Sequence, residues 1–454
     1  MTPLQDISEL RFNALAAYCR TPQALAAAEE VRWLQSGSEA ILVVVIRDRP
    51  DQDYGALILA RDARERYRCV DVTEFFPTID EAVAQATARA GRIAVNLDAE
   101  RLQGDERGAP IDFFAPLRPE ASLNPDFVRL SGLEGYSPAR KVIEPMMRWY
   151  EDADGNFVEQ FQTSGFDARM WELYLFATLV EAGYALDRRQ AVPDFHARGL
   201  FGEFFIEATT VNPRRDERGN LVPPPPLDAE DQMHAFQHEY VPIRYGGPLT
   251  AKLAKRYWER DNVQGKALLL AIQDFHAPMS MTISRGGLPT YLYGFAHDWH
   301  HDPDGTLIIT PHRVEVHRWG SKEIPSGFFR LPGAENISAV IFNNSATISK
   351  FNRMGLLAGF GSHRVRMIRQ GVALDLDPNA AEPRKFAKLV HEPDYRETWI
   401  EGMDVFHNPG ARVPIEPDLL PGAAHHWLQD DGRIDSLAPA WQPLSSQTLI
   451  TIEP

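Results

Sequence analysis

The sequence predicts a mixed α/β (α+β) protein, in which a central mixed sheet flanked by helices follows a small N-terminal α/β domain and precedes a mainly β C-terminal region. Three observations predict this fold class. Residues 40–46 form an apolar run of the length of a buried strand. Residues 167–182 carry apolar side chains around nearly the whole circumference of an expected helix, which is typical of a buried helix. Beyond residue 286, short β-rich stretches alternate with turn residues.

The length of the chain predicts two or three domains. Single hydrophobic cores stop growing near ~250–300 residues, and this chain has 454 residues, of which 44% are hydrophobic and 24% charged, the balance of a globular protein. Residues 104–125 are rich in Pro, Gly and charge, which indicates a connector. We therefore expect domains at residues 1–110, 111–285 and 286–454.

The sequence shows no pattern for export or for membrane insertion. The first thirty residues alternate apolar and charged groups and lack the pattern of a signal peptide. The longest apolar run is far shorter than the ~20 residues of a membrane span. Cys19 and Cys69 are the two cysteines, fewer than a secreted protein of this size usually carries. A cytoplasmic protein without membrane contact is expected.

Within the first domain we expect three strands and one helix. The strands are predicted at residues 40–46, 56–60 and 67–72, and the helix at residues 80–89. Thr78 is placed to cap that helix. The aspartates of this part lie in or near turns, where their side chains hydrogen-bond the local backbone, and we interpret them as structural.

The middle part places three acidic residues where they could meet. Glu172 lies within the apolar belt of the helix expected from Asp167 onward, where an ionised carboxylate needs a partner or a metal. Its other interpretation is a residue of the first turns, favoured there by the helix dipole. Asp194 stands at the start of a strand, and Glu207 lies in the next one, with Thr209 on the same face. A hairpin would bring Asp194 and Glu207 together, with Glu172 above them.

Three converging carboxylates suit Mg²⁺ or Mn²⁺. Mg²⁺ prefers oxygen ligands and is commonly held by one or two carboxylates together with water and phosphate oxygens. Without a cation, repulsion among the carboxylates would raise at least one pKa. A metal bound there would polarise a phosphoryl oxygen and generate hydroxide from bound water.

Between residues 166 and 275 the chain resembles the PD-(D/E)xK phosphodiesterase superfamily. The resemblance implies a restriction-endonuclease-like sheet and a magnesium-dependent endonuclease, with Glu172, Asp194 and Glu207 as metal ligands. The last motif position is normally a Lys that orients or activates the attacking water, and here it is Thr209, which makes the chain a divergent member. The residues that carry the resemblance are Glu172, Gly183, Tyr184, Pro193, Asp194, Glu207, Ala208 and Thr209.

A second element could supply the missing cation. The Thr209 hydroxyl can hydrogen-bond water but carries no positive charge for a transition state. In this superfamily the basic residue can migrate to a neighbouring element. A helix is expected to open at residues 247–250 and to carry Lys252 and Lys255 on a similar face. Lys255 is our first candidate and Lys252 our second, and ordinary solvent-facing lysines are the alternative.

Nucleic-acid binding would have to use a local basic patch. The net charge of 47 − 63 = −16 argues against indiscriminate coating of nucleic acid, because phosphate affinity comes from clustered cations. Arg214 and Arg215, on a Pro-rich flap at residues 212–231, are expected to line the cleft with Lys252 and Arg256. Solvated surface charge is the alternative for every basic cluster. A further cluster comprises Lys350, Arg353, Arg364, Arg366 and Arg369.

Two functional hypotheses follow from these residues. The first is a metal-dependent nuclease that hydrolyses phosphodiester bonds, with DNA favoured over RNA as substrate. The second is a catalytically degenerate protein that retained the fold as a binding or scaffold module, because Thr209 replaces the motif Lys. Both are compatible with a homodimer or with a partner protein.

Other patterns in the sequence are weaker. Residues 297–302 are dense in possible zinc ligands, but the turn residues at 303–305 favour a hairpin with solvated histidines. No Gly-rich phosphate loop followed by Lys-Ser or Lys-Thr occurs. From Asp375 onward no long periodic element is visible, and this tail is expected to wrap the rest of the chain rather than form a core.

Overall fold

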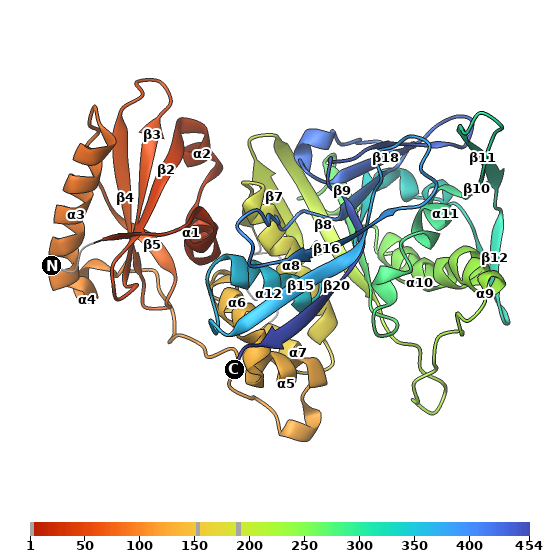
Figure 1. Ribbon diagram of the computed structural model, residues 1–454, viewed down its shortest axis with the longest axis horizontal. Helices are drawn as coiled ribbons and strands as arrows, with labels where there is room; N and C mark the ends of the chain where they lie inside the picture. The colour runs from red at the N-terminus through yellow and green to blue at the C-terminus, as the bar shows by residue number, and fades with distance from the viewer. Residues whose placement is uncertain (1–3, 151–154, 188–191) are drawn as a thin grey trace.

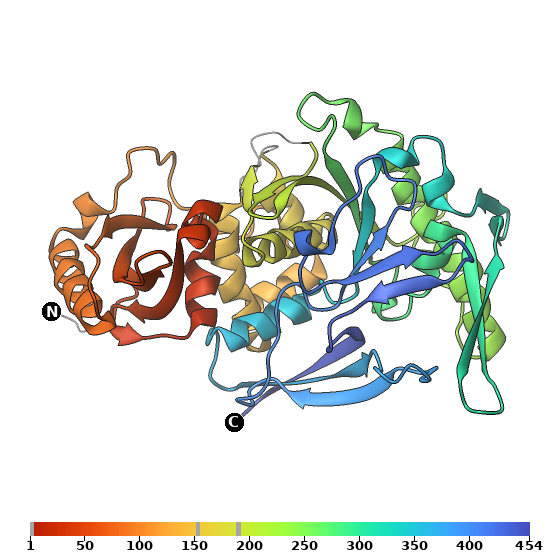
Figure 2. The same cartoon turned by 90° about the horizontal axis from the view of Figure 1, so that it is seen from above.

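The computed structural model describes residues 4–150, 155–187 and 192–454 and confirms a mixed α+β protein. Figure 1 shows an N-terminal unit on the left and a larger body on the right, and Figure 2 shows the same division from above. The expected connector at residues 104–125 contains one short 3-10 helix before α5 begins at Pro125, and it runs between the two parts.

The N-terminal unit is an antiparallel sheet in the strand order β1 to β5. The three predicted strands and the predicted helix are present. The Thr78 hydroxyl caps that helix by accepting a hydrogen bond from the Glu81 amide. The elements are β1 (Gln5–Asp6), α1 (Glu9–Ala16), α2 (Pro22–Ala27), β2 (Ala28–Gln35), β3 (Ile41–Asp48), β4 (Tyr54–Arg61), β5 (Tyr67–Val72), α3 (Ile79–Val95) and α4 (Leu97–Glu100).

Opposite faces of this small sheet are covered by different helices. Ala82, Ala86 and Ala90 of α3 pack with Val43 and Ile58 of the sheet. On the other face, α1 buries its apolar side chains against alternate residues of β3 and β4. The unit therefore has an apolar core on each side of the sheet.

The larger body is built on one mixed sheet of eight strands in the order β19-β18-β17-β14-β9-β8-β7-β6. Strands β8, β9 and β14 are mutually parallel, and β7 runs antiparallel to β8. The expected boundary at residue 285 falls between strands that share this sheet. The strands are β6 (Ala185–Asp187), β7 (Phe195–Gly199), β8 (Gly202–Val211), β9 (Ala267–Asp274), β14 (Ala339–Asn343), β17 (Met403–His407), β18 (Ala424–Leu428) and β19 (Ile434–Leu437).

Helices cover both faces of the main sheet. Phe204 and Ile206 of β8 pack toward the core that contains α8. Phe205, from the opposite face of the same strand, packs with α10 and α11. The helices of the body are α5 (Pro125–Gly132), α6 (Ser137–Trp149), α7 (Phe157–Gln162), α8 (Phe166–Glu181), α9 (Glu230–Ala235), α10 (Val241–Leu253), α11 (Gly287–Tyr293) and α12 (Ile348–Leu357).

The expectation that the chain beyond Asp375 only wraps the body is wrong. Strand β17 lies inside the main sheet and is buried at all five positions. Asp404 and His407 interrupt its apolar pattern, which is why the sequence conceals the strand. Burial alone would raise the pKa of Asp404, but the ion pair with Arg285 and the hydrogen bond with His426 lower that pKa to about 2. The tail also supplies strands to the main sheet and to a second one.

The remaining strands form smaller sheets. One has three strands in the order β16-β15-β20, and the others are two hairpins, β10 with β11 and β12 with β13. The turn residues at 303–305 join β10 to β11, as expected. These strands are β10 (Phe295–His301), β11 (Leu307–Arg313), β12 (Val316–Trp319), β13 (Lys322–Pro325), β15 (Val365–Ala373), β16 (Arg384–Leu389) and β20 (Pro443–Ile452).

Two helix ends differ from the prediction. Helix α10 begins at Val241, not near residue 247, and ends at Leu253, so Lys255 and Arg256 lie beyond it. Pro248 lies inside the helix, although its position in the sequence favoured a helix start. Helix α8 begins at Phe166, and Asp167 lies in its first turn instead of capping it.

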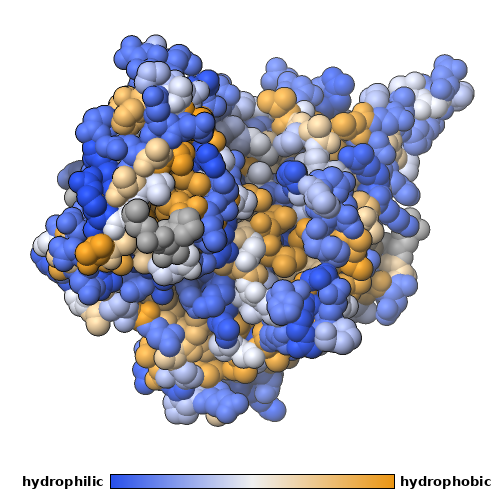
Figure 3. Space-filling model, turned by 60° about the vertical axis from the view of Figure 1, so that its left-hand side comes forward, coloured by the Kyte–Doolittle hydropathy of each residue, from blue (hydrophilic) through white to orange (hydrophobic). Residues whose placement is uncertain are grey.

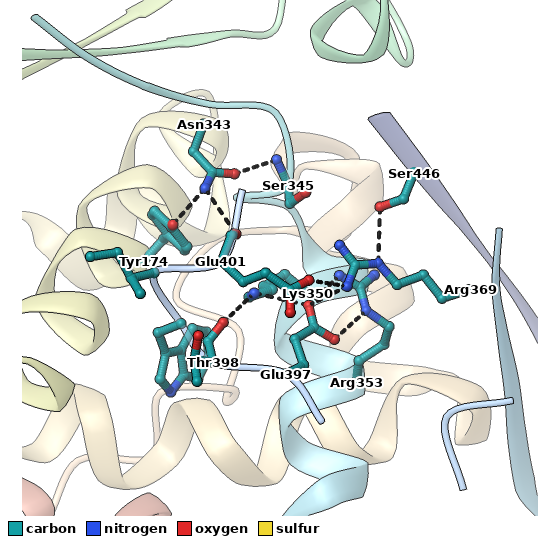
Figure 4. Close-up of polar contacts among 12 residues, drawn as sticks. Tyr174, Asn343, Ser345, Lys350, Arg353, Arg369, Glu397, Thr398, Glu401 and Ser446 are labelled. Atoms are coloured by element: carbon teal, nitrogen blue, oxygen red, sulfur yellow. Dashed lines mark hydrogen bonds and ion pairs between the residues drawn. The ribbon is translucent and has the colours of Figure 1, made fainter. Parts of the chain in front are cut away.

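Part of the C-terminal basic cluster is not a surface patch. Lys350, Arg353 and Arg369 are buried and surround the carboxylate of Glu397, as Figure 4 shows. Arg369 also pairs with Glu401. The acids that pair with these cations lie far from them in the sequence. The sequence pattern therefore indicated a basic cluster and gave no sign of its acidic partners. Ion pairing, not solvent, satisfies these three charges.

The face of the molecule drawn in Figure 3 is mostly hydrophilic, and hydrophobic residues gather in a central hollow. Within the described residues, no helix is both long enough and apolar enough to cross a membrane.

Candidate active site

The β7–β8 hairpin brings the two predicted acids together. Phe195 pairs with Ile206 in this antiparallel register, so Asp194, one residue earlier, lies opposite Glu207. The Asp194 amide donates a hydrogen bond to Glu207 Oε2 (3.3 Å), and the Ala208 amide donates to Asp194 Oδ2 (2.7 Å). Among the described residues, no hydrogen-bond donor reaches the other Asp194 oxygen, Oδ1.

Glu207 is bound by a lysine and a tyrosine from the α10 side of the sheet. Its side chain is 5% exposed and pairs through Oε1 with the Lys252 ammonium group. Tyr257 donates a hydrogen bond to the same oxygen at 2.8 Å. Because Lys252 and Tyr257 hold Oε1 and the Asp194 amide holds Oε2, the carboxylate is fixed in one orientation.

Glu172 faces the site from α8 and has cationic and phenolic partners. Arg169 Nη1 lies 2.9 Å from both Glu172 oxygens, one helical turn away. Tyr150 donates a hydrogen bond to Oε2 of the same carboxylate. The expected need of this buried acid for a partner is therefore met by protein groups.

The three acids lie close enough to influence one another. Burial raises the pKa of Asp194 to about 7, and the nearby charges of Glu207 and Glu172 add to the rise, against an opposing effect of Lys252. Such a shift is typical of carboxylates gathered in a partly desolvated site and is frequent at functional sites.

Asp194→Asn should raise the thermal stability of the metal-free protein at and above pH 7. The ordinary pKa of an aspartate is 3.8, and the pKa of Asp194 in the folded protein is about 7. The protonated carboxyl therefore stabilises the folded protein fully below about pH 4, and this stabilisation is lost as the pH rises through 7. Asparagine stays neutral, so the variant should melt a few °C higher at pH 8, at about 2–4 °C per kcal/mol. Melting scans in EDTA from pH 4 to pH 8 measure this, and equal midpoints at pH 8 would contradict the shift.

Comparisons with protein-family models, with curated proteins and with solved structures found no match. The assignment of a role to this site therefore depends on its own geometry.

The remaining predicted site residues lie on β8, on α10, beyond the end of α10 and on the flap after β8. Thr209 follows Glu207 on the same face of β8 and is half-buried. Lys255 is exposed, and Arg256 is exposed and paired with Glu259. Arg214 and Arg215 are exposed on the flap that follows β8. Of the two candidate lysines, Lys252 is the one in contact with Glu207.

The donor set fits a divalent cation held by two carboxylates. Asp194 and Glu207 provide oxygen donors from adjacent strands, and Mg²⁺ commonly binds through one or two carboxylates plus water and phosphate oxygens. Within the described ranges, no group of three or more His, Cys, Asp or Glu side chains is arranged to hold a metal ion. Glu172 is engaged by Arg169, as Glu207 is by Lys252, and its role as a third ligand stays a prediction.

The histidine-rich segment has other contacts. His312 lies 2.8 Å from Asp298 across the β10–β11 hairpin, and His297 lies 2.9 Å from the Gly432 carbonyl. His317 is buried and lies 2.7 Å from the Ser326 hydroxyl. The structure thus places these histidines in separate contacts.

Three residues of the site had no role in the sequence prediction. Arg169 lies one turn before Glu172, and that spacing could have indicated the pair. Tyr150 comes from the end of α6, and no local pattern links it to Glu172. Tyr257 reaches Glu207 because the chain turns at Arg256, which has a left-handed backbone that the sequence did not reveal.

Proposed function

We propose that this chain is a metal-dependent nuclease that hydrolyses phosphodiester bonds, with DNA favoured as the substrate. One observation carries the proposal: Asp194 and Glu207 meet on the β7–β8 hairpin, and a lysine from α10 contacts Glu207. Two acids and a cation at one point are the groups that phosphodiester hydrolysis with Mg²⁺ or Mn²⁺ requires.

The order of elements around the acids supports the proposal. Helix α8 is followed by β6, β7 and β8, then by α9 and α10, and then by β9, which is parallel to β8. The resemblance to the PD-(D/E)xK superfamily leads us to expect, in this order, the helix with Glu172, the hairpin with Asp194 and Glu207, a helix with a basic residue and the strand at residues 267–272. We therefore interpret residues 166–275 as a divergent restriction-endonuclease-like core.

Lys252 takes the role of the missing motif lysine in this proposal. Its ammonium group reaches Glu207 from α10, on the side of β8 that also carries Thr209. A cation there compensates the charge of the acids and stabilises negative charge that develops on a phosphate. Lys255, our first candidate from the sequence, is exposed and has no assigned role.

Each residue of the site has a separate role in the proposed reaction. A bound metal would supply a Lewis acid and lower the pKa of its water. Asp194 and Glu207 would hold it. Tyr257 orients Glu207, and Arg169 balances the charge of Glu172.

Asp194→Ala should abolish both Mn²⁺ binding and metal-dependent cleavage of DNA. The substitution removes one of the two carboxylates, and the other one, Glu207, is already engaged by Lys252 and Tyr257. Titration calorimetry with Mn²⁺ and a plasmid-cleavage assay measure the two losses. Asp228→Ala, at an exposed aspartate of the same part of the chain, is the control. Unchanged Mn²⁺ affinity in Asp194→Ala would refute the site.

The alternative remains a binding or scaffold module. It is favoured by the complete pairing of Glu207, whose two oxygens already accept from Lys252, Tyr257 and the Asp194 amide. A protein that binds DNA in Ca²⁺ but cuts neither DNA nor RNA in Mg²⁺ or Mn²⁺ would match this alternative.

DNA affinity should fall steeply with salt and should depend on the flap arginines. The chain carries a net charge of −16, so binding needs a local cationic lining. Each phosphate contact contributes about −0.9 to the slope of log affinity against log salt. Replacing Arg214 and Arg215 together by Ala should reduce that slope by about 2. Gel shifts in Ca²⁺ at several salt concentrations test this, and an unchanged slope would place the flap outside the interface.

A further inference from the structure

A cavity of about 700 Å³ lies at the carboxyl ends of three parallel strands. Pro213 follows β8, Phe275 follows β9 and Asn344 follows β14, and all three residues line the cavity. The crevice outside the carboxyl ends of parallel strands is the usual ligand position in open sheets with helices on both faces. None of the residues that line this cavity belongs to the acidic site at Asp194 and Glu207.

The first turn of α12 opens into this cavity. The helix has ten residues, and its N-cap residue, Thr347, makes no capping hydrogen bond through its side chain. Within the described part of the chain, no acceptor is found for the amides of Ile348 and Ser349. Thr347, Ile348 and Ser349 all line the cavity. Unoccupied amides at a helix N-terminus are suited to bind an anion.

A buried histidine faces the same cavity. His276 is 5% exposed, and its Nδ1 lies 2.8 Å and 2.9 Å from the two carboxylate oxygens of Asp274. Contact with the carboxylate orients the ring and assigns Nδ1 as the donor. Across the described residues, Nε2 of this ring has no hydrogen-bond partner, although the residue lines the cavity. The ring as a whole is buried, but its Nε2 is not enclosed by protein atoms, so this nitrogen is available to a ligand in the cavity.

A buried guanidinium group lies at the wall beside α12. Arg353 is 2% exposed and lines the cavity. It donates to both oxygens of Glu397 and, through Nη1, to the Thr448 hydroxyl at 2.6 Å. These bonds use three of the five guanidinium hydrogens. Ser446, another residue of the wall, accepts from Arg369 Nε (Figure 4).

The rest of the cavity wall is apolar and acidic, unlike the side formed by α12. Phe166, Met170 and Met281 provide apolar surface, and Asp126 and Asp167 provide carboxylates. Asp126 is paired with Arg129 at 2.7 Å. Carboxylates repel a phosphate but accept hydrogen bonds from hydroxyl and amino groups. The cavity therefore suits a ligand with an anionic end, an apolar planar part and several hydrogen-bond donors.

From this combination we propose that the cavity binds a nucleoside 5′-monophosphate. The phosphate lies against the α12 amides, Arg353 and His276, and the base lies on the apolar wall, with Asp167 accepting from its amino group or from the ribose hydroxyls. A cavity of about 700 Å³ is within the range of small-molecule sites. The inference does not depend on the nuclease activity proposed above.

Ser349→Glu should weaken nucleotide binding at least tenfold, and Ser349→Gln should leave it within about twofold. A carboxylate in the first turn is compatible with the helix, because it interacts favourably with the helix dipole. It places a negative charge where the phosphate is expected. Titration calorimetry of the full chain with the four ribonucleoside and four deoxyribonucleoside 5′-monophosphates measures the effect. The matching nucleosides and inorganic phosphate serve as the comparison ligands.

His276→Asn should weaken the nucleotide and should leave binding of the nucleoside less changed, since the ring faces the phosphate. Asp194→Ala should keep full nucleotide affinity, which separates this site from the nuclease site. The proposal is overturned if no monophosphate binds, if Ser349→Glu and Ser349→Gln bind equally well, or if inorganic phosphate binds as tightly as the nucleotides.

Discussion

Lys252→Ala should lower the rate of metal-dependent DNA cleavage by about 10²–10³-fold, the usual effect of removing one preorganised electrostatic donor. The ammonium group of Lys252 contacts Glu207, whereas Lys255 is exposed beyond the end of α10. Lys255→Ala is therefore the matched control, since it removes the same charge three residues away, and it should cut at the parent rate. Single-turnover cleavage at saturating enzyme separates this effect from DNA binding.

A second variant tests whether the role is electrostatic. Thr209 lies on the same face of β8 as Glu207, at the position where the resemblance expects Lys. Thr209→Lys in the Lys252→Ala background should restore part of the lost rate. Equal rates for Lys252→Ala and the parent would remove Lys252 from the mechanism. A slow Lys255→Ala protein would return the role to our first candidate.

The sequence predicted the two acids because their separation depends on local structure alone. A tight hairpin between two short strands puts Asp194 opposite Glu207 whatever the rest of the chain does. The lysine was harder to predict, because its position depends on where α10 ends and how it packs on β8. The sequence prediction began that helix six residues late and continued it past Leu253, where α10 ends, and this second error placed Lys255 and Lys252 on one helix face.

The strands of the C-terminal part could not be predicted from periodicity. Strand β17 is buried on both faces, so it shows no alternation, and Asp404 and His407 break the apolar run that would otherwise indicate it. Their partners, Arg285 and His425, lie in other elements of the chain. When a buried polar group finds its hydrogen-bond partner far away in the sequence, its position in the sequence resembles that of a loop residue, and the strand is missed.

Glu397→Gln should destabilise the main body by about 3–5 kcal/mol, the usual result of removing one partner from a buried ion pair. The Glu397 carboxylate accepts from Arg353 at 2.7 and 2.8 Å, from Tyr395 at 2.6 Å and lies 2.9 Å from Lys350. The glutamine amide has one acceptor oxygen and no charge, so Lys350 and Arg353 lose the charge of their paired carboxylate, while Arg369 keeps its ion pair with Glu401. Burial already lowers the pKa of Lys350, and loss of the Glu397 charge should lower it further.

The control for this prediction is an exposed ion pair of similar geometry. Arg318 and Glu323 lie 2.7 Å apart with side chains 68% and 58% exposed, so Glu323→Gln should change the stability by about 0–1 kcal/mol. Urea unfolding followed by tryptophan fluorescence reports on the body, because Trp399 packs on Phe351 beside the charge cluster. Equal unfolding midpoints for Glu397→Gln and Glu323→Gln would show that water or a rearranged partner compensates the buried cations. A large loss in Glu397→Gln alone would show that these cations need Glu397 for the body to fold stably.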